Sequence, residues 1–292
     1  MSFLSQLING LSVGSIYALI ALGYTMVYGI AKMLNFAHGD VIMVGAYTIF
    51  TAVSMLGLDY WIAIILSVVF CTVLGIVIEK IAYKPLRKAS PLTVLITAIG
   101  VSYLLQNIVL LIYGSHQRPF PKIISVKSIK IGENLVISGE AFFTMVITIV
   151  IMIILTLFIK NSKTGRAMVA VSEDKGAAEL MGINVNRIIS ITFAIGSGLA
   201  AIAGLFFAST YGFIGPYSGA MPGIKAFIAA VLGGIGSIPG AMLGGILLGV
   251  VEGLSKAYIS TELSDAIVFS ILIVILLFKP SGLLGKNVTE KV

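Results

Sequence analysis

Long apolar runs recur along the whole chain, and this pattern restricts the fold more than any other feature of the sequence. Each run holds roughly 18 residues or more, which is enough for one α-helix to cross a bilayer. The sequence therefore predicts an all-α polytopic membrane protein with a single transmembrane domain over residues 1–292. The expected spans are 7–31, 37–57, 61–79, 91–113, 141–160, 188–208, 223–254 and 262–279.

Charged residues are scarce, making up 11% of the chain against 58% for hydrophobic residues. A soluble domain of this length would carry about twice that charged fraction. The net charge of +7 does not indicate a nucleic-acid partner, because Lys and Arg are spread over many short loops. Basic residues are typical of the cytoplasmic ends of spans, so the lipid bilayer is the expected environment. The single cysteine, Cys71, lies inside an apolar run, which excludes an intrachain disulfide and favours a packing role.

Basic residues in two loops indicate the orientation of the spans. Loops 79–90 and 160–187 are separated by two spans, so they lie on the same side, and together they hold nine Lys and Arg residues. Loop 114–140 lies between those two spans and holds four. The positive-inside bias therefore places 79–90 and 160–187 in the cytoplasm and 114–140 outside. Within this external loop, ISVKSIKI (124–131) alternates well enough for a short strand or hairpin.

The C-terminal tail carries three lysines and is also expected in the cytoplasm, which requires an even number of crossings between Arg187 and Lys279. Three apolar stretches lie in that interval, and 223–254 is too long for one helix. GGIGSIPGA interrupts it, since Pro239 removes a backbone donor. Two segments restore the parity and give about 8–9 transmembrane helices, some of them discontinuous. The side of the N-terminus stays open, because 7–36 could be one run or two.

Glycines form two rows at helical spacing near the C-terminal end. Gly240 and Gly244 are four residues apart, as are Gly245, Gly249 and Gly253. Such small-residue ridges let helices approach closely in lipid. Tight packing inside the chain is the favoured interpretation, and a dimer interface is the alternative.

Few residues could support catalysis or ion coupling. The chain has two histidines, His38 and His116, whereas zinc sites usually need three or four protein ligands. Neither a metal nor a cofactor is therefore expected. No catalytic residue is predicted either, because no GxSxG frames a nucleophile and GLLGKN (282–287) lacks the phosphate-loop pattern. Glu252 and Lys256 are four residues apart near a span end and are interpreted as an interfacial ion pair. So few ionisable residues within the spans argue against an ion-driven pump.

SEDKGAAELMGINVNR (172–187) predicts a short amphipathic helix within a cytoplasmic loop. Ser172 is the expected N-cap, with Glu173 and Asp174 in the first turn. Gly182 is expected to close the helix as a C-cap would. Small side chains on one face would permit close docking into a groove of a partner protein, whereas the alternative is a plain connector.

Three segments together resemble the LivH-type permeases, which are membrane subunits of ABC importers for branched-chain amino acids. The first is GSIYALIALGYTMVYGI followed by NFAHGD, the second is EDKGAAELMGINVNRIISITFAIGSGLAAIAG, and the third is KAFIAAVLGGIGSIPGAMLGGILLGVVE. The resemblance runs essentially from end to end. It implies an ABC importer permease fold and a transport subunit that translocates leucine, isoleucine and valine while its partners hydrolyse ATP.

The resemblance also implies the partners and the location. The expected partners are a LivM-like second permease subunit, two cytoplasmic ATPase subunits and an external solute-binding protein. The expected location is a bacterial or archaeal cell (inner) membrane, with the C-terminus in the cytoplasm. Related permeases are assigned to urea, short amides and other amino acids, so these remain alternative substrates. An ATP-independent channel or secondary transporter, and an intramembrane enzyme, are the other function classes.

Loop 160–187 contains the segment that resembles the cytoplasmic coupling segment of this family. The resemblance implies that motion of the ATPase subunits reaches the membrane through this loop. The residues expected to make the contact are Glu173, Asp174, Ala177, Ala178, Glu179 and Gly182.

NFAHGD (35–40) places an amide, an imidazole and a carboxylate between two apolar runs. Broken helices can offer backbone groups to the polar ends of a zwitterion such as an amino acid. We therefore expect NFAHGD to mark a helix break, with Asn35 and His38 facing the translocation path or the moving joint of the mechanism. A capped loop at the membrane edge is the alternative.

Overall fold

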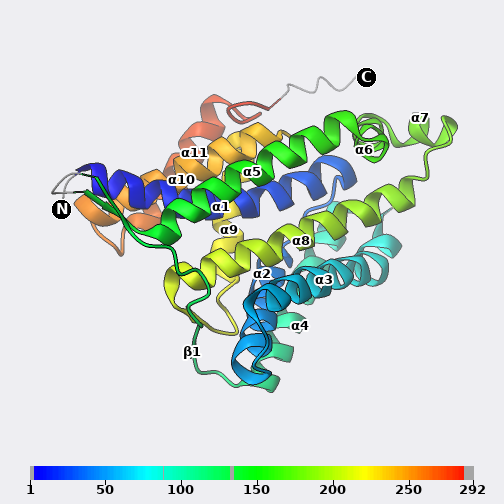
Figure 1. The fold of residues 1–292 in the computed structure, drawn as a ribbon. Helices are drawn as coiled ribbons and strands as arrows, with labels where there is room; N and C mark the ends of the chain where they lie inside the picture. Colours follow the sequence, from blue (N-terminus) through cyan, green and yellow to red (C-terminus); the bar gives the residue numbers. More distant parts are fainter. Residues whose placement is uncertain (1–2, 88, 132–134, 286–292) are drawn as a thin grey trace. The chain divides into compact units, whose positions relative to one another are not determined.

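The computed structural model describes residues 3–87, 89–131 and 135–285. Within them the chain forms eleven α-helices and four short strands (Figure 1). Its contacts divide the chain into two compact units. The first unit comprises Met1–Thr25, Val126–Met152 and Lys225–Val292, and the second comprises Met26–Ser125 and Ile153–Ile224.

The helices follow one another along a chain that passes between the two units inside α1, α5 and α9 and in the loop between β1 and β2. They are α1 (Phe3–Ala31), α2 (His38–Phe50), α3 (Tyr60–Ile78), α4 (Pro91–Tyr113), α5 (Gly139–Asn161), α6 (Lys163–Glu173), α7 (Lys175–Leu180), α8 (Val185–Tyr211), α9 (Ala220–Gly233), α10 (Ile238–Tyr258) and α11 (Ser264–Phe278). The strands are β1 (Arg118–Pro119), β2 (Ile129–Ile131), β3 (Leu135–Ile137) and β4 (Phe213–Ile214).

Six helical segments in the described part of the chain are long and apolar enough to cross a membrane. Five are α1, α4, α5, α8 and α10, and the sixth is Tyr60–Leu86, in which α3 continues through a π-helical and a 3-10 turn. The helices α9 and α11 are apolar but shorter. The prediction of an all-α polytopic membrane protein is confirmed, while the expected count of 8–9 crossings is only approximate. Helix α1 runs through 29 residues without interruption.

In the second unit, α8 lies beside both α2 and α3 (Figure 1). Small residues make this approach possible: a Cβ on Gly45 would lie 2.8 Å from the Cα of Ala201. The Ser67 hydroxyl of α3 donates a hydrogen bond to the Gly45 carbonyl of α2 over 2.8 Å. Cys71 is fully buried in the same layer, which confirms its predicted packing role.

In the first unit, both glycine rows of α10 face other helices of the same chain. Gly245, Gly249 and Gly253 lie so close to α1 that a Cβ on any of them would fall under 3.0 Å from the Ala18, Gly14 or Gly10 backbone. The other row, Gly240 and Gly244, meets the backbone of α9 in the same way. Internal packing is therefore confirmed as the use of both rows, because the chain's own helices occupy the faces that a dimer would need.

The long apolar stretch 223–254 is two helices, as the parity argument predicted. Helix α9 ends at Gly233, and Gly234 and Gly236 take φ of +103° and +95°, values that favour glycine. Ser237 then caps α10 by accepting a hydrogen bond from the Gly240 N–H over 3.2 Å. Proline in the first turn of α10 costs no helical hydrogen bond there.

The predicted hairpin in the 114–140 loop is confirmed over part of its length. Strand β2 pairs with β3 in antiparallel register, with Ile129 opposite Ile137. A second short pairing joins this loop to the end of α8, with Arg118 of β1 opposite Ile214 of β4.

Candidate functional site

The NFAHGD segment forms the predicted break between two helices of the second unit. Helix α1 ends at Ala31, Lys32 takes a left-handed φ of +58°, and helical structure resumes only at His38. Both Asn35 and His38 are buried. The Asn35 side-chain oxygen accepts a hydrogen bond from the Tyr83 hydroxyl over 2.9 Å.

The first turn of α2 is held tightly against neighbouring elements. A Cβ on Gly39 would fall 3.0 Å from the Cα of Gly223 at the start of α9. Asp40 is buried and accepts a hydrogen bond from the Gln106 side chain of α4 over 2.9 Å. Asn35 and His38 thus lie within packed protein, so their place on a translocation path remains a prediction.

The loop between α5 and α8 contains two short helices where the sequence predicted one. Ser162 caps α6 by accepting from the Gly165 N–H over 2.8 Å, and Asp174 caps α7 by accepting from the Ala177 N–H over 3.0 Å. The prediction of Ser172 as the N-cap is wrong, because the apolar face of α6 carries the helix on through Glu173. The Ser172 hydroxyl instead donates to the Val169 carbonyl inside α6 over 2.7 Å.

Helix α7 ends where the sequence predicted. Gly182 takes φ of +80°, a left-handed value. Its N–H donates to the Glu179 carbonyl over 2.9 Å, while the Ile183 N–H donates to the Ala178 carbonyl over 3.0 Å. This pair of bonds is the Schellman motif, which satisfies carbonyls at the end of a helix. With Asp174 at one end and Gly182 at the other, the six residues of α7 are capped on both sides.

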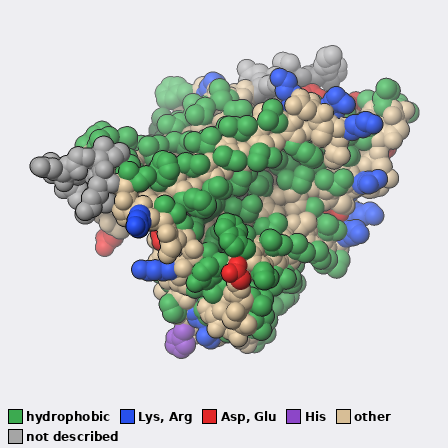
Figure 2. All heavy atoms as spheres, in the orientation of Figure 1, with side chains coloured by type: hydrophobic (Ala, Val, Ile, Leu, Met, Phe, Trp, Pro, Cys, Tyr) green, Lys and Arg blue, Asp and Glu red, His purple; other side chains and the backbone are tan. Residues whose placement is uncertain are grey.

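The faces of α7 differ from those expected. Ala178 is 3% exposed and packs against the chain itself, whereas Ala177 and Glu179 are exposed. The sequence argument did not single out Leu180 and Met181, which are 91% and 82% exposed. Figure 2 shows Lys and Arg side chains gathered where α6 and α7 lie, at the right of the picture. Leu180 and Met181 therefore project from a region rich in charge.

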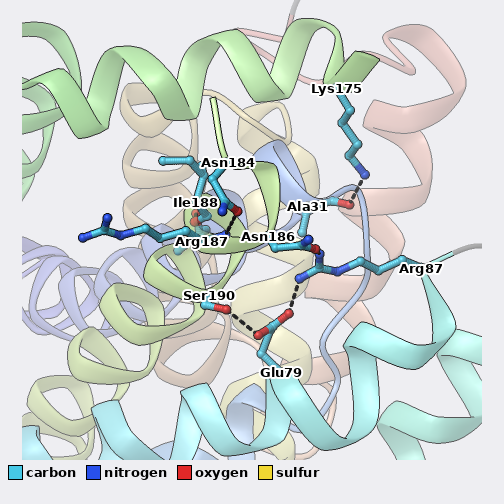
Figure 3. Close-up of polar contacts among 10 residues, drawn as sticks. Ala31, Glu79, Arg87, Lys175, Asn184, Asn186, Arg187, Ile188 and Ser190 are labelled. Carbon is cyan, nitrogen blue, oxygen red and sulfur yellow. Dashed lines mark hydrogen bonds and ion pairs between the residues drawn. The ribbon is translucent and has the colours of Figure 1, made fainter. Parts of the chain in front are cut away.

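A network of polar contacts anchors the first turns of α8 to the segment that follows α3 (Figure 3). Glu79 is completely buried and forms an ion pair with Arg87. Its second carboxylate oxygen accepts a hydrogen bond from the Ser190 hydroxyl of α8 over 2.6 Å. Arg87 also donates to the side-chain oxygen of Asn186. A buried charge needs such partners, because an unpaired charge away from water is costly.

A second contact in Figure 3 joins α7 to α1. The Lys175 Nζ donates a hydrogen bond to the Ala31 carbonyl oxygen over 2.9 Å. Burial lowers the pKa of Lys175, and the nearby charges of Arg87 and Lys32 lower it further. Nearby, Asn184 caps α8 by accepting a hydrogen bond from the Arg187 N–H over 3.0 Å.

In the first unit, Glu252 is the centre of a cluster of charged groups. The predicted pair with Lys256 is present, but Glu252 is only 1% exposed and the pair is one part of a larger buried cluster. Glu252 also accepts hydrogen bonds from Tyr17 over 2.8 Å and from Lys225 over 2.9 Å. Lys225 lies 2.7 Å from Asp265 as well. Helix packing, which brings α1, α9, α10 and α11 together, creates this cluster.

The comparison with known proteins identifies the family. Residues 6–276 match the profile of a family described as the branched-chain amino acid transport system permease component. The chain belongs to this family. Members of this permease family are transport components rather than enzymes, and the chain is a multi-pass membrane protein.

Individual relatives agree with the permease family along the whole chain. The high-affinity branched-chain amino acid transport system permease protein LivH of Salmonella typhimurium is 47% identical over 99% of this chain and 98% of its own length. The corresponding BraD protein of Pseudomonas aeruginosa is 47% identical, with the same coverage. A solved structure of PsaBC from Streptococcus pneumoniae covers 95% of this chain and 92% of its own at 15% identity, with a TM-score of 0.47. That score is too low to contribute to the argument.

Proposed function

We propose that this chain is the membrane-spanning permease subunit of an ATP-driven importer that translocates branched-chain amino acids. The observation that carries this proposal is identity of 47% over nearly the full length of two permeases named for that transport. A second permease subunit of LivM type, two cytoplasmic ATPase subunits and an external solute-binding protein complete the transporter. The C-terminus and the loop containing α6 and α7 face the cytoplasm.

The proposal is tested by uptake into vesicles that contain the permease pair, the ATPase subunits and the binding protein. We expect uptake of labelled leucine, isoleucine and valine, and we expect that uptake to require ATP on the side of the membrane where the ATPase subunits are bound. Excess unlabelled leucine should compete, whereas urea and acetamide should not. Uptake that continues without ATP would indicate a channel or secondary transporter, and competition by urea or acetamide alone would indicate a different substrate class.

Within this function, α7 is the element on which an ATPase subunit docks. Its two caps make it a short rigid projection, and Leu180 and Met181 form an apolar tip. Adjacent large apolar side chains that are exposed outside the spans form an apolar patch, and such patches mark protein contact sites. Exposed acidic residues lie on α7 and directly before it and can pair with basic residues of the ATPase. They are Glu173, Asp174 and Glu179.

The contact differs in one respect from that expected from sequence. Ala178 is buried and packs α7 against the rest of its own chain. The exposed side chains of Leu180 and Met181 make the contact with the ATPase subunit. Asn35 and His38 are proposed to belong to the moving joint at the α1–α2 break, since both are buried within it. Gly182 shapes the turn that returns the chain to α8.

Docking through α7 is tested by replacing both Leu180 and Met181 with Ser. We expect the ATPase subunits to be lost on co-purification and ATP-driven uptake to fall at least tenfold, because the apolar tip no longer fills a groove. The matched control is Val169→Ser, which changes an exposed apolar residue of α6 and should leave both measurements unchanged. Normal co-purification of the ATPases with the double variant would show that they dock elsewhere.

A further inference from the structure

Lys175 stands at an unfavourable position for a cation. It is the first residue of α7, where the partial positive charge of a helix N-terminus repels another positive charge. Arg87 and Lys32 add further positive charge nearby. Glu173 and Asp174 precede Lys175 in the chain, but its side chain is only partly exposed and its ammonium also has a specific partner elsewhere in the fold.

The partner is the carboxyl end of α1. Ala31 is the last residue of that helix, and its carbonyl lies 2.9 Å from the Lys175 Nζ although the two residues are 144 positions apart. The last four carbonyls of a helix lack partners within it. They also carry the negative end of the helix dipole, which favours a cation. The Lys175 side chain thus caps the C-terminal end of α1, because it gives the Ala31 carbonyl a hydrogen-bond donor and a positive charge.

The chain immediately after Ala31 is the break that separates α1 from α2. Lys32 takes a left-handed conformation, and the segment runs on to His38 outside any helix. Asn35, in the middle of the break, is bonded to Tyr83, and the turn that carries Tyr83 begins at Glu79, which is bonded to α8. The break is therefore tied both to the start of α8 and, next to it at Ala31, to α7 itself.

We propose that Lys175 is a positioning residue that transmits displacement of α7 to the break between α1 and α2. The inference rests on the proposed docking of an ATPase subunit on α7. A movement of α7 that preserves the Lys175–Ala31 bond pulls directly on the end of α1. The following residues can absorb the change in backbone angles, because residues outside regular helices act as hinges. Asn35 and His38 lie within or beside this joint.

The first test uses the complete transporter in vesicles with Lys175→Met, which is one atom shorter, keeps an unbranched apolar side chain and removes the charge and donors. We expect the ATPase subunits to co-purify and to hydrolyse ATP normally, while leucine transported per ATP falls at least tenfold. Lys175→Arg retains a charged donor and should keep at least half of the normal ratio. The matched control, Lys163→Met, changes the exposed first residue of α6 and should leave the ratio unchanged.

The second test replaces the hydrogen bond by a covalent bridge. In a Cys71→Ala background, Lys175→Cys is combined with Lys32→Cys, because Lys32 is exposed and directly follows Ala31. We expect the doubly substituted protein to transport little leucine per ATP hydrolysed. A short bifunctional reagent that links the two thiols should restore at least half of the normal amount of leucine per ATP. Restoration shows that α7 and the end of α1 move together, whereas further loss on bridging shows that they must separate and overturns the proposal.

The outcomes separate this inference from the proposed function. If the Leu180→Ser, Met181→Ser protein keeps its ATPase subunits, α7 is not the docking element, and the inference falls with it. If docking through α7 holds but Lys175→Met transports normally per ATP, only the inference is wrong. Loss of the ATPase subunits from Lys175→Met would assign Lys175 a purely structural role in holding α7.

Discussion

At the scale of single residues, Glu252 has an environment that is unusual for a membrane helix. Its carboxylate is buried and accepts hydrogen bonds from one tyrosine and two lysines, Tyr17, Lys225 and Lys256. Burying an ionisable side chain inside a membrane span costs free energy, and such side chains are found paired with one another. Asp265 shares Lys225 with Glu252 but is partly exposed, with 39% of its side chain accessible. The four charges balance, so each member of the cluster depends on the others.

Replacing Glu252 with Gln should destabilise the first unit, because it leaves Lys225 and Lys256 without their buried counter-charge. Removing one partner of a buried pair typically costs about 3–5 kcal/mol. The comparison variant is Asp265→Asn, which should cost much less, since its partly exposed side chain is solvated in both states. Denaturant unfolding of each purified variant in detergent measures its loss of unfolding free energy relative to the unsubstituted protein. Equal stability losses in the two variants would contradict this prediction, because they would show that burial of the Glu252 carboxylate does not increase the cost of removing its charge.

At the level of helices, close packing through glycine holds α1 against α10. The Gly249 position admits no Cβ, because that atom would fall under 3.0 Å from the backbone of Gly14. Without a hydrophobic driving force between helices in lipid, association depends on van der Waals contact and on backbones that approach closely. The row of glycines is therefore the main reason these two helices can pack along several turns.

We expect Gly249→Leu to separate α1 from α10 and to prevent accumulation of folded protein. The matched control is Gly100→Leu on α4, where an added Cβ would meet nothing within 4 Å. Size-exclusion chromatography of detergent-solubilised protein should show a monodisperse peak for the control and aggregation for Gly249→Leu. A monodisperse, thermally stable Gly249→Leu protein would contradict the proposed packing.

At the scale of the whole molecule, the charged loops predict the orientation of the chain in the membrane. The positive-inside bias predicts that α6 and the C-terminal end lie on one side and the 114–140 loop on the other. The chain contains a single cysteine, which is buried, so Cys71→Ala gives a background in which one introduced thiol can be labelled.

In that background, His116→Cys should react with a membrane-impermeant maleimide added to intact cells. Lys163→Cys and Lys279→Cys should react only after the membrane is permeabilised. All three positions are exposed, so a difference in labelling reports the side of the membrane rather than burial. Labelling of Lys279→Cys from outside would place the C-terminal end opposite to the orientation proposed.

The sequence by itself determined the features that depend on local chemistry. Apolar length decides which segments can span a bilayer. Pro239 fits the first turn of α10, and the glycines decide where 223–254 breaks into α9 and α10, because Gly234 and Gly236 take positive φ. Gly182 ends α7 for the same reason. Each of these depends on a few neighbouring residues, so a pattern in the chain is enough to predict it.

Only the tertiary structure decided which side chains meet. The sequence placed Asp174 in the first turn after a Ser172 cap, but Asp174 is the N-cap of α7, because α6 extends through Glu173 while its apolar face packs. The contacts of Glu79 with Ser190 and of Lys175 with Ala31 join residues 111 and 144 positions apart. Such pairs depend on how helices stack, and helix stacking in turn depends on where small residues let backbones approach. No local pattern carries that information.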